Sequence, residues 1–143
     1  MGEIVQNTCA LLHSMIVQTG TYITRPETWP LVVGYAPWVE HIWSNYMSNA
    51  IEYGGNPPLI DLGASHSEDG LVSFWVRDNG RGLSLDQQVR IFQPFTRLVE
   101  RNVEGHGLGL AIVAHIVDKL GGQVGVESSM DEGSTFSFSL PLA

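Results

Sequence analysis

The most restrictive part of this sequence is a run of alternating glycines that leads directly into a long apolar segment. Gly105-His106-Gly107-Leu108-Gly109-Leu110 opens the segment, and Gly121-Gly122 closes it. The strongly apolar stretch from Leu108 to Leu120 predicts a helix packed into a core. Glycines before a helix expose backbone N–H groups at its positive end, where they can bind phosphate. A flexible lead-in that binds no ligand is the alternative interpretation.

Two common phosphate-binding loops fit this run poorly. A Rossmann fingerprint requires a preceding strand and a glycine at the position of Leu110, whereas the upstream segment is a polar loop. A Walker loop requires Gly-Lys-Ser/Thr, but the sole lysine, Lys119, lies at the far end of the predicted helix. If these glycines bind phosphate, they belong to another kind of site.

Length and charge narrow the class of protein. A chain of 143 residues with 43% hydrophobic and 15% charged residues is expected to form one globular domain. No apolar run approaches the roughly 18 residues of a membrane span, no signal peptide is visible, and the single cysteine, Cys9, fits a reducing compartment, so a cytoplasmic location is expected. A net charge of −8 argues against nucleic acid as a partner. Backbone N–H groups and a divalent cation can still bind a triphosphate.

Hydrophobic periodicity and turn residues predict an α+β fold. Helices and strands alternate irregularly, with hairpin-like pairs of strands in the second half, which favours a two-layer sandwich. The sheet should be mixed but mainly antiparallel, with helices packed on one face. The predicted helices are 4–18, 37–53, 86–92 and 108–120, and the predicted strands are 22–24, 31–33, 59–64, 71–78, 123–128 and 135–140.

The second predicted helix carries a polar face beside its core stripe. Asn45, Asn49 and Glu52 are spaced at i, i+4 and i+7, so they share one face. Asparagines form helices poorly, but their amide oxygens can bind Mg²⁺ or hydrogen-bond its waters. A solvated pair of asparagines is the equally simple alternative.

Asp78-Asn79-Gly80-Arg81-Gly82 follows a predicted strand. A carboxylate at a strand end, beside glycines that permit close backbone approach, can accept a hydrogen bond from an exocyclic amino group such as adenine N6. An ordinary turn has the same composition. Phe92-Gln93-Pro94-Phe95 and Gly133-Ser134-Thr135 are likewise uninformative when each is read alone.

In this order, the segments resemble the catalytic domain of two-component sensor histidine kinases, which has the Bergerat ATP-binding fold. The N box of that family is similar to 45–53, its first glycine box to 78–82 and its F box to 92–95. The second glycine box is similar to 105–113, and the third glycine element to 133–135. The resemblance covers 38–141, which is most of the chain.

The resemblance implies roles for individual residues. Asn49 would bind Mg²⁺, Asn45 would support the phosphates, and Asp78 would accept a hydrogen bond from adenine N6, with Thr135 bracing Asp78. The segment 96–104 would close as a lid, and Arg97 or Arg101 would supply its positive charge. The complete implied ATP site is Asn45, Asn49, Tyr53, Asp78, Gly80, Gly82, Phe95, Arg97, Gly105, Gly107, Leu108, Gly109, Leu110 and Thr135.

Two positions bear on the type of reaction. Related gyrase, mismatch-repair and chaperone ATPases place a catalytic Glu where this chain has Asn45, and an amide cannot accept a proton at neutral pH. The substitution favours a kinase over a hydrolase. Many family members also have a basic residue where this chain has Glu52, whose carboxylate would repel phosphate unless it turned away.

The expected function is therefore transfer of the ATP γ-phosphoryl group to a histidine on a separate dimerisation segment, which in the family lies well before the N box. Residues 1–20 would be a remnant of that segment or an extension, and 21–143 the ATP-binding domain. The isolated chain should not autophosphorylate, and a response-regulator receiver domain is the implied downstream partner. The parent protein would be either soluble or membrane-anchored. A serine kinase of the anti-sigma-factor type and a non-catalytic nucleotide sensor remain the alternatives.

Overall fold

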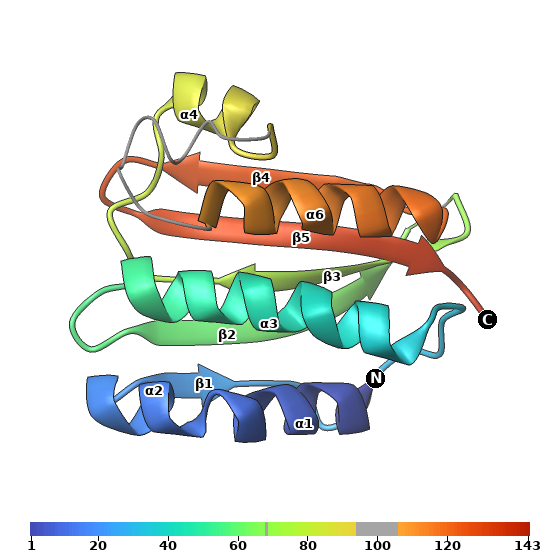
Figure 1. Ribbon diagram of the computed structural model, residues 1–143, viewed down its shortest axis with the longest axis horizontal. Helices are drawn as coiled ribbons and strands as arrows, with labels where there is room; N and C mark the ends of the chain where they lie inside the picture. Colours follow the sequence, from blue (N-terminus) through green and yellow to red (C-terminus); the bar gives the residue numbers. More distant parts are fainter. Residues whose placement is uncertain (68, 94–105) are drawn as a thin grey trace.

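The computed structural model describes residues 1–67, 69–93 and 106–143, and its elements follow the predicted order (Figure 1). The helices are α1 (Gly2–Leu11), α2 (His13–Thr19), α3 (Ala36–Tyr53), α4 (Leu85–Arg90) and α6 (His106–Lys119). The strands are β1 (Tyr22–Thr24), β2 (Leu59–His66), β3 (Leu71–Arg77), β4 (Val124–Ser129) and β5 (Gly133–Pro141).

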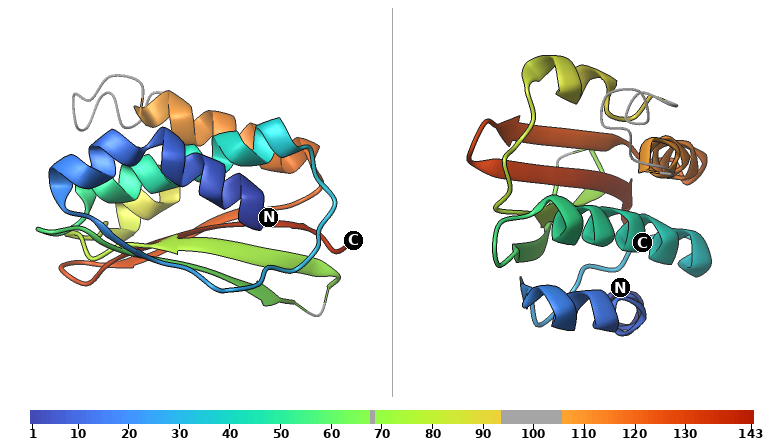
Figure 2. Two further views of the ribbon diagram at one scale, coloured as in Figure 1. Left: turned by 90° about the horizontal axis from the view of Figure 1, so that it is seen from below. Right: turned by 60° about the vertical axis from the view of Figure 1, so that its left-hand side comes forward.

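The five strands form one mixed sheet in the order β1-β2-β3-β5-β4. Only β1 and β2 run parallel, and the other three pairings are antiparallel. Figure 2 shows the helices gathered on one face of this sheet, while the other face is left open. The predicted two-layer α+β sandwich is therefore confirmed.

The core lies between this helical layer and the covered face of the sheet. In α3, residues spaced by three and four positions are buried, as the sequence predicted, and α6 contributes a similar stripe. The Phe74 and Phe138 rings stack with centroids 5.2 Å apart, and the Trp43 ring meets Phe138 edge-on at 5.3 Å. The buried apolar residues of α3 and α6 are Val39, Ile42, Trp43, Tyr46, Met47, Ala50, Ile51, Leu110, Val113 and Val117. This packing fixes where α3 and α6 begin and end relative to the sheet.

The N-terminal segment is two helices rather than the single predicted helix. Leu12 separates them with φ −94° and ψ 10°, and nothing in its sequence marks the break. Val5 and Thr8 are fully buried, and the Trp43 indole Nε1 donates to the Met1 sulfur at 3.1 Å. Residues 1–20 thus pack onto α3, and their assignment to a dimerisation segment remains a prediction.

The strand predicted at 31–33 is also wrong in its extent. Only an isolated bridge joins Val32 to Leu142, supported by a hydrogen bond from Val33 N to Pro141 O at 2.8 Å. Pro141 has no N–H with which to continue the ladder. The segment therefore adds a single bridge just beyond the C-terminal end of β5 instead of a sixth strand.

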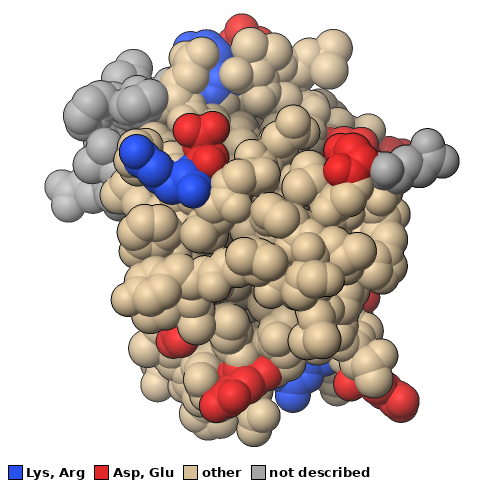
Figure 3. Space-filling view, turned by 90° about the vertical axis from the view of Figure 1, so that its right-hand side faces the viewer, with Lys and Arg blue, Asp and Glu red and all other residues tan. Residues whose placement is uncertain are grey.

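The end of the molecule beside this bridge has an apolar surface. Figure 3 shows only scattered charged side chains on the face turned toward the viewer. The exposed apolar side chains of this segment and the C-terminus are Leu31, Val33, Tyr35, Trp38 and Leu142. The candidate site lies at the opposite end, where α3 and β3 terminate.

A buried hydrogen bond ties α3 to the sheet. The Tyr46 hydroxyl donates to Ser137 O at 2.8 Å, and Tyr46 has no exposed surface. Its burial raises the pKa of the phenol, so the hydroxyl keeps its proton. Tyr46→Phe should lower the free energy of unfolding by about 1 kcal/mol in urea denaturation, because a buried hydrogen bond is lost. The exposed Tyr22→Phe is the matched control, and equal stability of both variants would contradict the assignment.

Candidate functional site

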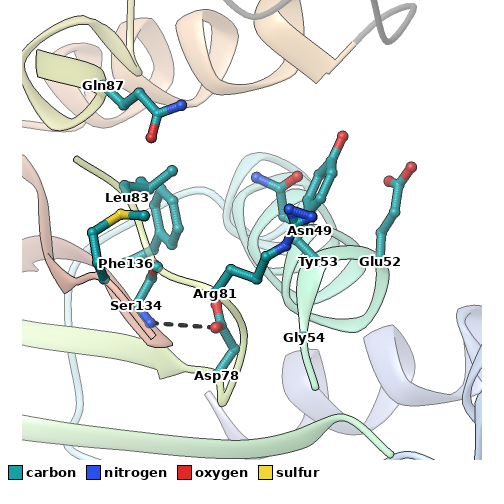
Figure 4. A pocket seen from close by; sticks show the side chains of 12 residues that line it. Asn49, Glu52, Tyr53, Gly54, Asp78, Arg81, Leu83, Gln87, Ser134 and Phe136 are labelled. Atoms are coloured by element: carbon teal, nitrogen blue, oxygen red, sulfur yellow. Dashed lines mark hydrogen bonds between the residues drawn. The ribbon is translucent and has the colours of Figure 1, made fainter. Parts of the chain in front are cut away.

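A cavity of about 620 Å³ opens at the end of α3, above the end of β3. Its walls come from α3, the loop after β3, α4, the β4–β5 turn and β5 (Figure 4). The described residues that line it are Asn49, Glu52, Tyr53, Gly54, Asp78, Arg81, Gly82, Leu83, Gln87, Met130, Ser134 and Phe136. Their mixture of apolar walls and a few charged groups is typical of a small-molecule site.

Asp78 lies at the base of this cavity and is 7% exposed. Its Oδ1 atom accepts hydrogen bonds from the backbone N–H groups of Gly80 at 2.9 Å and Ser134 at 3.3 Å. Burial raises the pKa of the Asp78 carboxyl, and these two N–H groups partly oppose the rise. Since both recorded hydrogen bonds go to Oδ1, the Oδ2 atom is available to a ligand.

Gly80 and Gly82 permit close packing of the loop after β3, and Gly82 lines the cavity. A Cβ atom on Gly80 would overlap Tyr53 O at the end of α3, and one on Gly82 would overlap Ser129 O at the end of β4. The loop after β3 can therefore press against both walls of the cavity only with glycine at these positions. This packing holds Asp78 between them.

The contact predicted between Thr135 and Asp78 is made by Ser134 instead. The Thr135 hydroxyl accepts a hydrogen bond from Arg77 Nε at 3.3 Å, and these two residues are partners in the β3–β5 pairing. Because side chains alternate along a strand, Thr135 points to the open face of the sheet, opposite to Phe136. Ser134 lies on the cavity side, and its N–H and C=O groups both bond Asp78.

The two asparagines of α3 have different surroundings. Asn49 lines the cavity and is 5% exposed, and its Oδ1 atom has no hydrogen-bond partner among the described residues. Asn45 is not among the lining residues, and its Nδ2 donates to His41 O at 3.0 Å. The structure therefore brings Asn49 into the site, and the phosphate role of Asn45 remains a prediction.

An amide oxygen that is buried without a partner is costly unless a ligand supplies one. Carbonyl oxygens are suitable ligands for Mg²⁺, which usually keeps several waters and takes few protein ligands. Asn49 Oδ1 fits this requirement. In the described part of the chain, no group of three His, Cys, Asp or Glu side chains offers a competing metal site.

Tyr53 and Glu52 lie at the rim, at the last turn of α3. Glu52 is exposed, and Figure 4 shows its carboxylate beyond Tyr53, on the far side from Asp78. The Glu52 carboxylate, which was expected to repel phosphate unless it turned away, is thus directed away from the base of the cavity. It remains a negative charge at the rim.

The second glycine box is described only in part. Phe95, Arg97, Arg101 and Gly105 lie outside the described residues, while Gly107 and Leu108 are at the start of α6. Gly109 packs against α3, because a Cβ atom there would overlap Asn45 Oδ1. Leu110 is 1% exposed and belongs to the core rather than the cavity. The described part of the box therefore joins α6 to α3.

Eight lining residues were not part of the predicted ATP site, namely Glu52, Gly54, Arg81, Leu83, Gln87, Met130, Ser134 and Phe136. Arg81 and Leu83 were within or next to a predicted motif, so their proximity to the site was indicated. The alternation of Phe136, Phe138 and Leu140 also pointed to the correct strand face, since all three are buried. Gln87 and Met130 had no signal, because they reach the cavity through packing of α4 and the β4–β5 turn.

Comparison with known protein families agrees with this architecture. Residues 34–143 match the family of histidine kinase-, DNA gyrase B-, and HSP90-like ATPases. The chain belongs to this family of ATP-binding domains. Over 141 residues it is 32% identical to the methanogenesis regulatory histidine kinase FilI of Methanothrix harundinacea (strain 6Ac). That alignment covers 98% of this chain but only 16% of FilI, so the relative is a much longer protein.

Solved structures of histidine kinases share the fold. Full-length ShkA in complex with AMPPNP superposes with a TM-score of 0.84 at 29% identity, over 99% of this chain and 30% of ShkA. Histidine kinase ThkA in complex with response regulator protein TrrA gives a TM-score of 0.81 at 22% identity, over 100% of this chain and 40% of the ThkA chain. The structural class is thus that of the catalytic domain of sensor histidine kinases. Across residues 1–67, 69–93 and 106–143, no helix combines the length and apolarity needed to cross a membrane.

Proposed function

We propose that the chain binds ATP·Mg²⁺ in the cavity at the end of α3 and donates the γ-phosphoryl group to a histidine on a separate dimerisation segment of its parent kinase. The observation that carries the proposal is Asp78, a buried carboxylate with one oxygen fixed by two backbone N–H groups. Its other oxygen can accept a hydrogen bond from adenine N6. Phe136 and Leu83 supply apolar surface for the purine.

The phosphate tail would extend from this base toward α3. Asn49 would hold the metal ion, which neutralises charge on the phosphates. Transfer requires in-line attack by an imidazole nitrogen as the bond between the γ-phosphorus and the bridging oxygen breaks, leaving ADP. The chain's part is to position the nucleotide, since Asn45 stands where a hydrolase would need a basic carboxylate.

The downstream partner and the cellular location follow from the same proposal. The chain would work in the cytoplasm, and a receiver domain of a response regulator would take the phosphoryl group from the histidine. The complex of ThkA with TrrA supports this class of partner at the level of fold. Residues 1–20 would then be the end of the dimerisation segment, although they pack onto α3.

The phosphotransfer proposal is tested by mixing this chain with a purified dimerisation segment and γ-labelled ATP. We expect label on the histidine of the added segment and none on the chain incubated alone. Strong labelling of His13 in the chain alone would overturn the separate acceptor. Labelling of a serine on a small partner protein would replace the histidine kinase with the alternative serine kinase of the anti-sigma-factor type.

A nucleotide sensor without catalytic activity is the second candidate, favoured by the negative charge of Glu52 at the rim. It predicts that ATP binds but that no added histidine segment is labelled. Glu52→Lys distinguishes the two, because restoring positive charge should produce labelling only if Glu52 is what blocks the reaction. Absence of ATP binding by either protein would exclude both candidates.

The metal role of Asn49 has its own test. Asn49→Ala should lower ATP affinity at least about tenfold in the presence of Mg²⁺, as expected for loss of a group that holds a metal. Affinity measured in EDTA should change little, since the adenine contacts remain. Ser48→Ala, on the same helix and outside the cavity lining, is the control for calorimetry. Equal losses of affinity with and without Mg²⁺ would assign Asn49 to the nucleotide or to the fold instead.

A further inference from the structure

The charges around the cavity are unbalanced for binding a polyanion. Its described lining contains two carboxylates, Asp78 and Glu52, and a single cationic side chain, Arg81. The chain as a whole has a net charge of −8. A triphosphate entering this site therefore meets an unfavourable field unless a positive group lies beside its path.

The backbone of Arg81 is fixed from both sides. The N–H of Gly80 bonds the Asp78 carboxylate, and Arg81 O accepts a hydrogen bond from Asp131 N at 2.6 Å across the β4–β5 turn. Gly82, the next residue, packs against Ser129 O. The loop therefore holds the Cα atom of Arg81 at the cavity wall. These backbone contacts leave the side-chain conformation of Arg81 unrestrained.

That side chain is exposed and is directed across the cavity. Figure 4 shows the guanidinium group extending from the loop toward Asn49 and Tyr53 on α3. Among the described residues, it makes no hydrogen bond or ion pair. A guanidinium group in this position has its N–H fork free to bind oxyanions.

We propose that Arg81 binds phosphate oxygens of the nucleotide and sets the preference of the site for ATP and ADP over adenosine. This inference rests on the proposed ATP-binding function and adds a specificity-determining residue to it. Asp78 and Arg81, which lie on one short loop, would then bind the two ends of the same nucleotide. The carboxylate recognises the purine amino group, and the guanidinium compensates the negative charge of the tail beside Glu52.

The test is calorimetry with ATP, ADP and adenosine on the wild-type chain, Arg81→Gln and the control Arg25→Gln. Arg25 lies outside the cavity lining, and its Nη1 contacts the Cys9 sulfur at 3.8 Å. We expect Arg81→Gln to weaken ATP and ADP binding about tenfold or more, the scale of a charged hydrogen bond, and to leave adenosine affinity unchanged. Arg25→Gln should match the wild type for all three ligands.

Glu52→Lys provides a second readout in the Arg81→Gln background. A lysine at the rim should recover most of the lost ATP affinity if the defect is missing positive charge. Unchanged ATP affinity in Arg81→Gln, or an equal loss for adenosine, would overturn the role of Arg81 while the ATP site itself stands. If the wild-type chain bound no ATP, the proposed function would fail before Arg81 came into question.

Discussion

Asp78→Asn should reduce ATP affinity by about a hundredfold or more while the fold is retained. The asparagine Oδ1 can still accept the N–H groups of Gly80 and Ser134, which now bond the carboxylate at 2.9 and 3.3 Å. Its amide NH₂ would then occupy the position of Oδ2 and present a donor to adenine N6, which is also a donor. A buried polar group left unpaired in this way discriminates strongly against a ligand.

The difference in stability between this variant and the wild type should depend on pH in a defined direction. Burial raises the folded-state pKa of Asp78 above its usual value, so the folded chain binds this proton more tightly than the unfolded chain does. The free energy of unfolding therefore falls as pH rises from the unfolded pKa of about 3.9 to the higher folded pKa. Asp78→Asn has no such charge. Its stability relative to the wild type should be greater at neutral pH than well below pH about 3.9.

Asp61→Asn is the matched control for both measurements. Asp61 is exposed on β2, accepts a hydrogen bond from the Thr24 hydroxyl at 2.6 Å and is absent from the cavity lining. The Asp61→Asn substitution should leave ATP affinity unchanged. If Asp78→Asn bound ATP like the wild type, adenine recognition would have to be assigned elsewhere. If the stability of Asp78→Asn relative to the wild type were the same at both pH values, burial of the charged Asp78 carboxylate would not destabilise the fold.

Local sequence signals predicted two parts of the candidate site, the loop after β3 and the polar face of α3. The loop at Asp78 was predicted because its glycines follow an apolar strand, and the face of α3 that carries Asn49 followed from helical spacing. These features depend on a few consecutive residues. The core stripe of α3 was predicted for the same reason.

Features that depend on pairing between distant segments were harder to predict. The choice between Ser134 and Thr135 depends on the register of β5 with β3, which places Thr135 opposite Arg77. Whether Asn45 or Asn49 faces the cavity depends on how α6 packs, because Gly109 lies against Asn45. The direction of the Arg81 side chain likewise depends on the loop's contact with the β4–β5 turn. No spacing within one element contains this information.

Gly133→Ala should be a strongly damaging single-methyl change at this site. Gly133 has φ +88°, a conformation that costs an L-residue about 1–2 kcal/mol, and its added Cβ would overlap Asp78 O. Asp78 O belongs to backbone that is already hydrogen-bonded to β5 through Asp78 N and Ser134 O at 2.8 Å. The backbone must therefore shift, which moves the carboxylate away from its two N–H partners.

Gly70→Ala separates the cost of the positive φ from the cost of the steric overlap with Asp78 O. Gly70 also has a positive φ, +81°, but a Cβ there would meet nothing within 4 Å. Urea denaturation should show a loss of about 1–2 kcal/mol for Gly70→Ala, from conformation alone. Gly133→Ala should lose about 1–3 kcal/mol more, the scale of overpacking. It should also weaken ATP binding, which Gly70→Ala should preserve. Equal losses of stability in the two variants would mean that the contact between the β4–β5 turn and Asp78 is loose, and that Asp78 is positioned by its own loop alone.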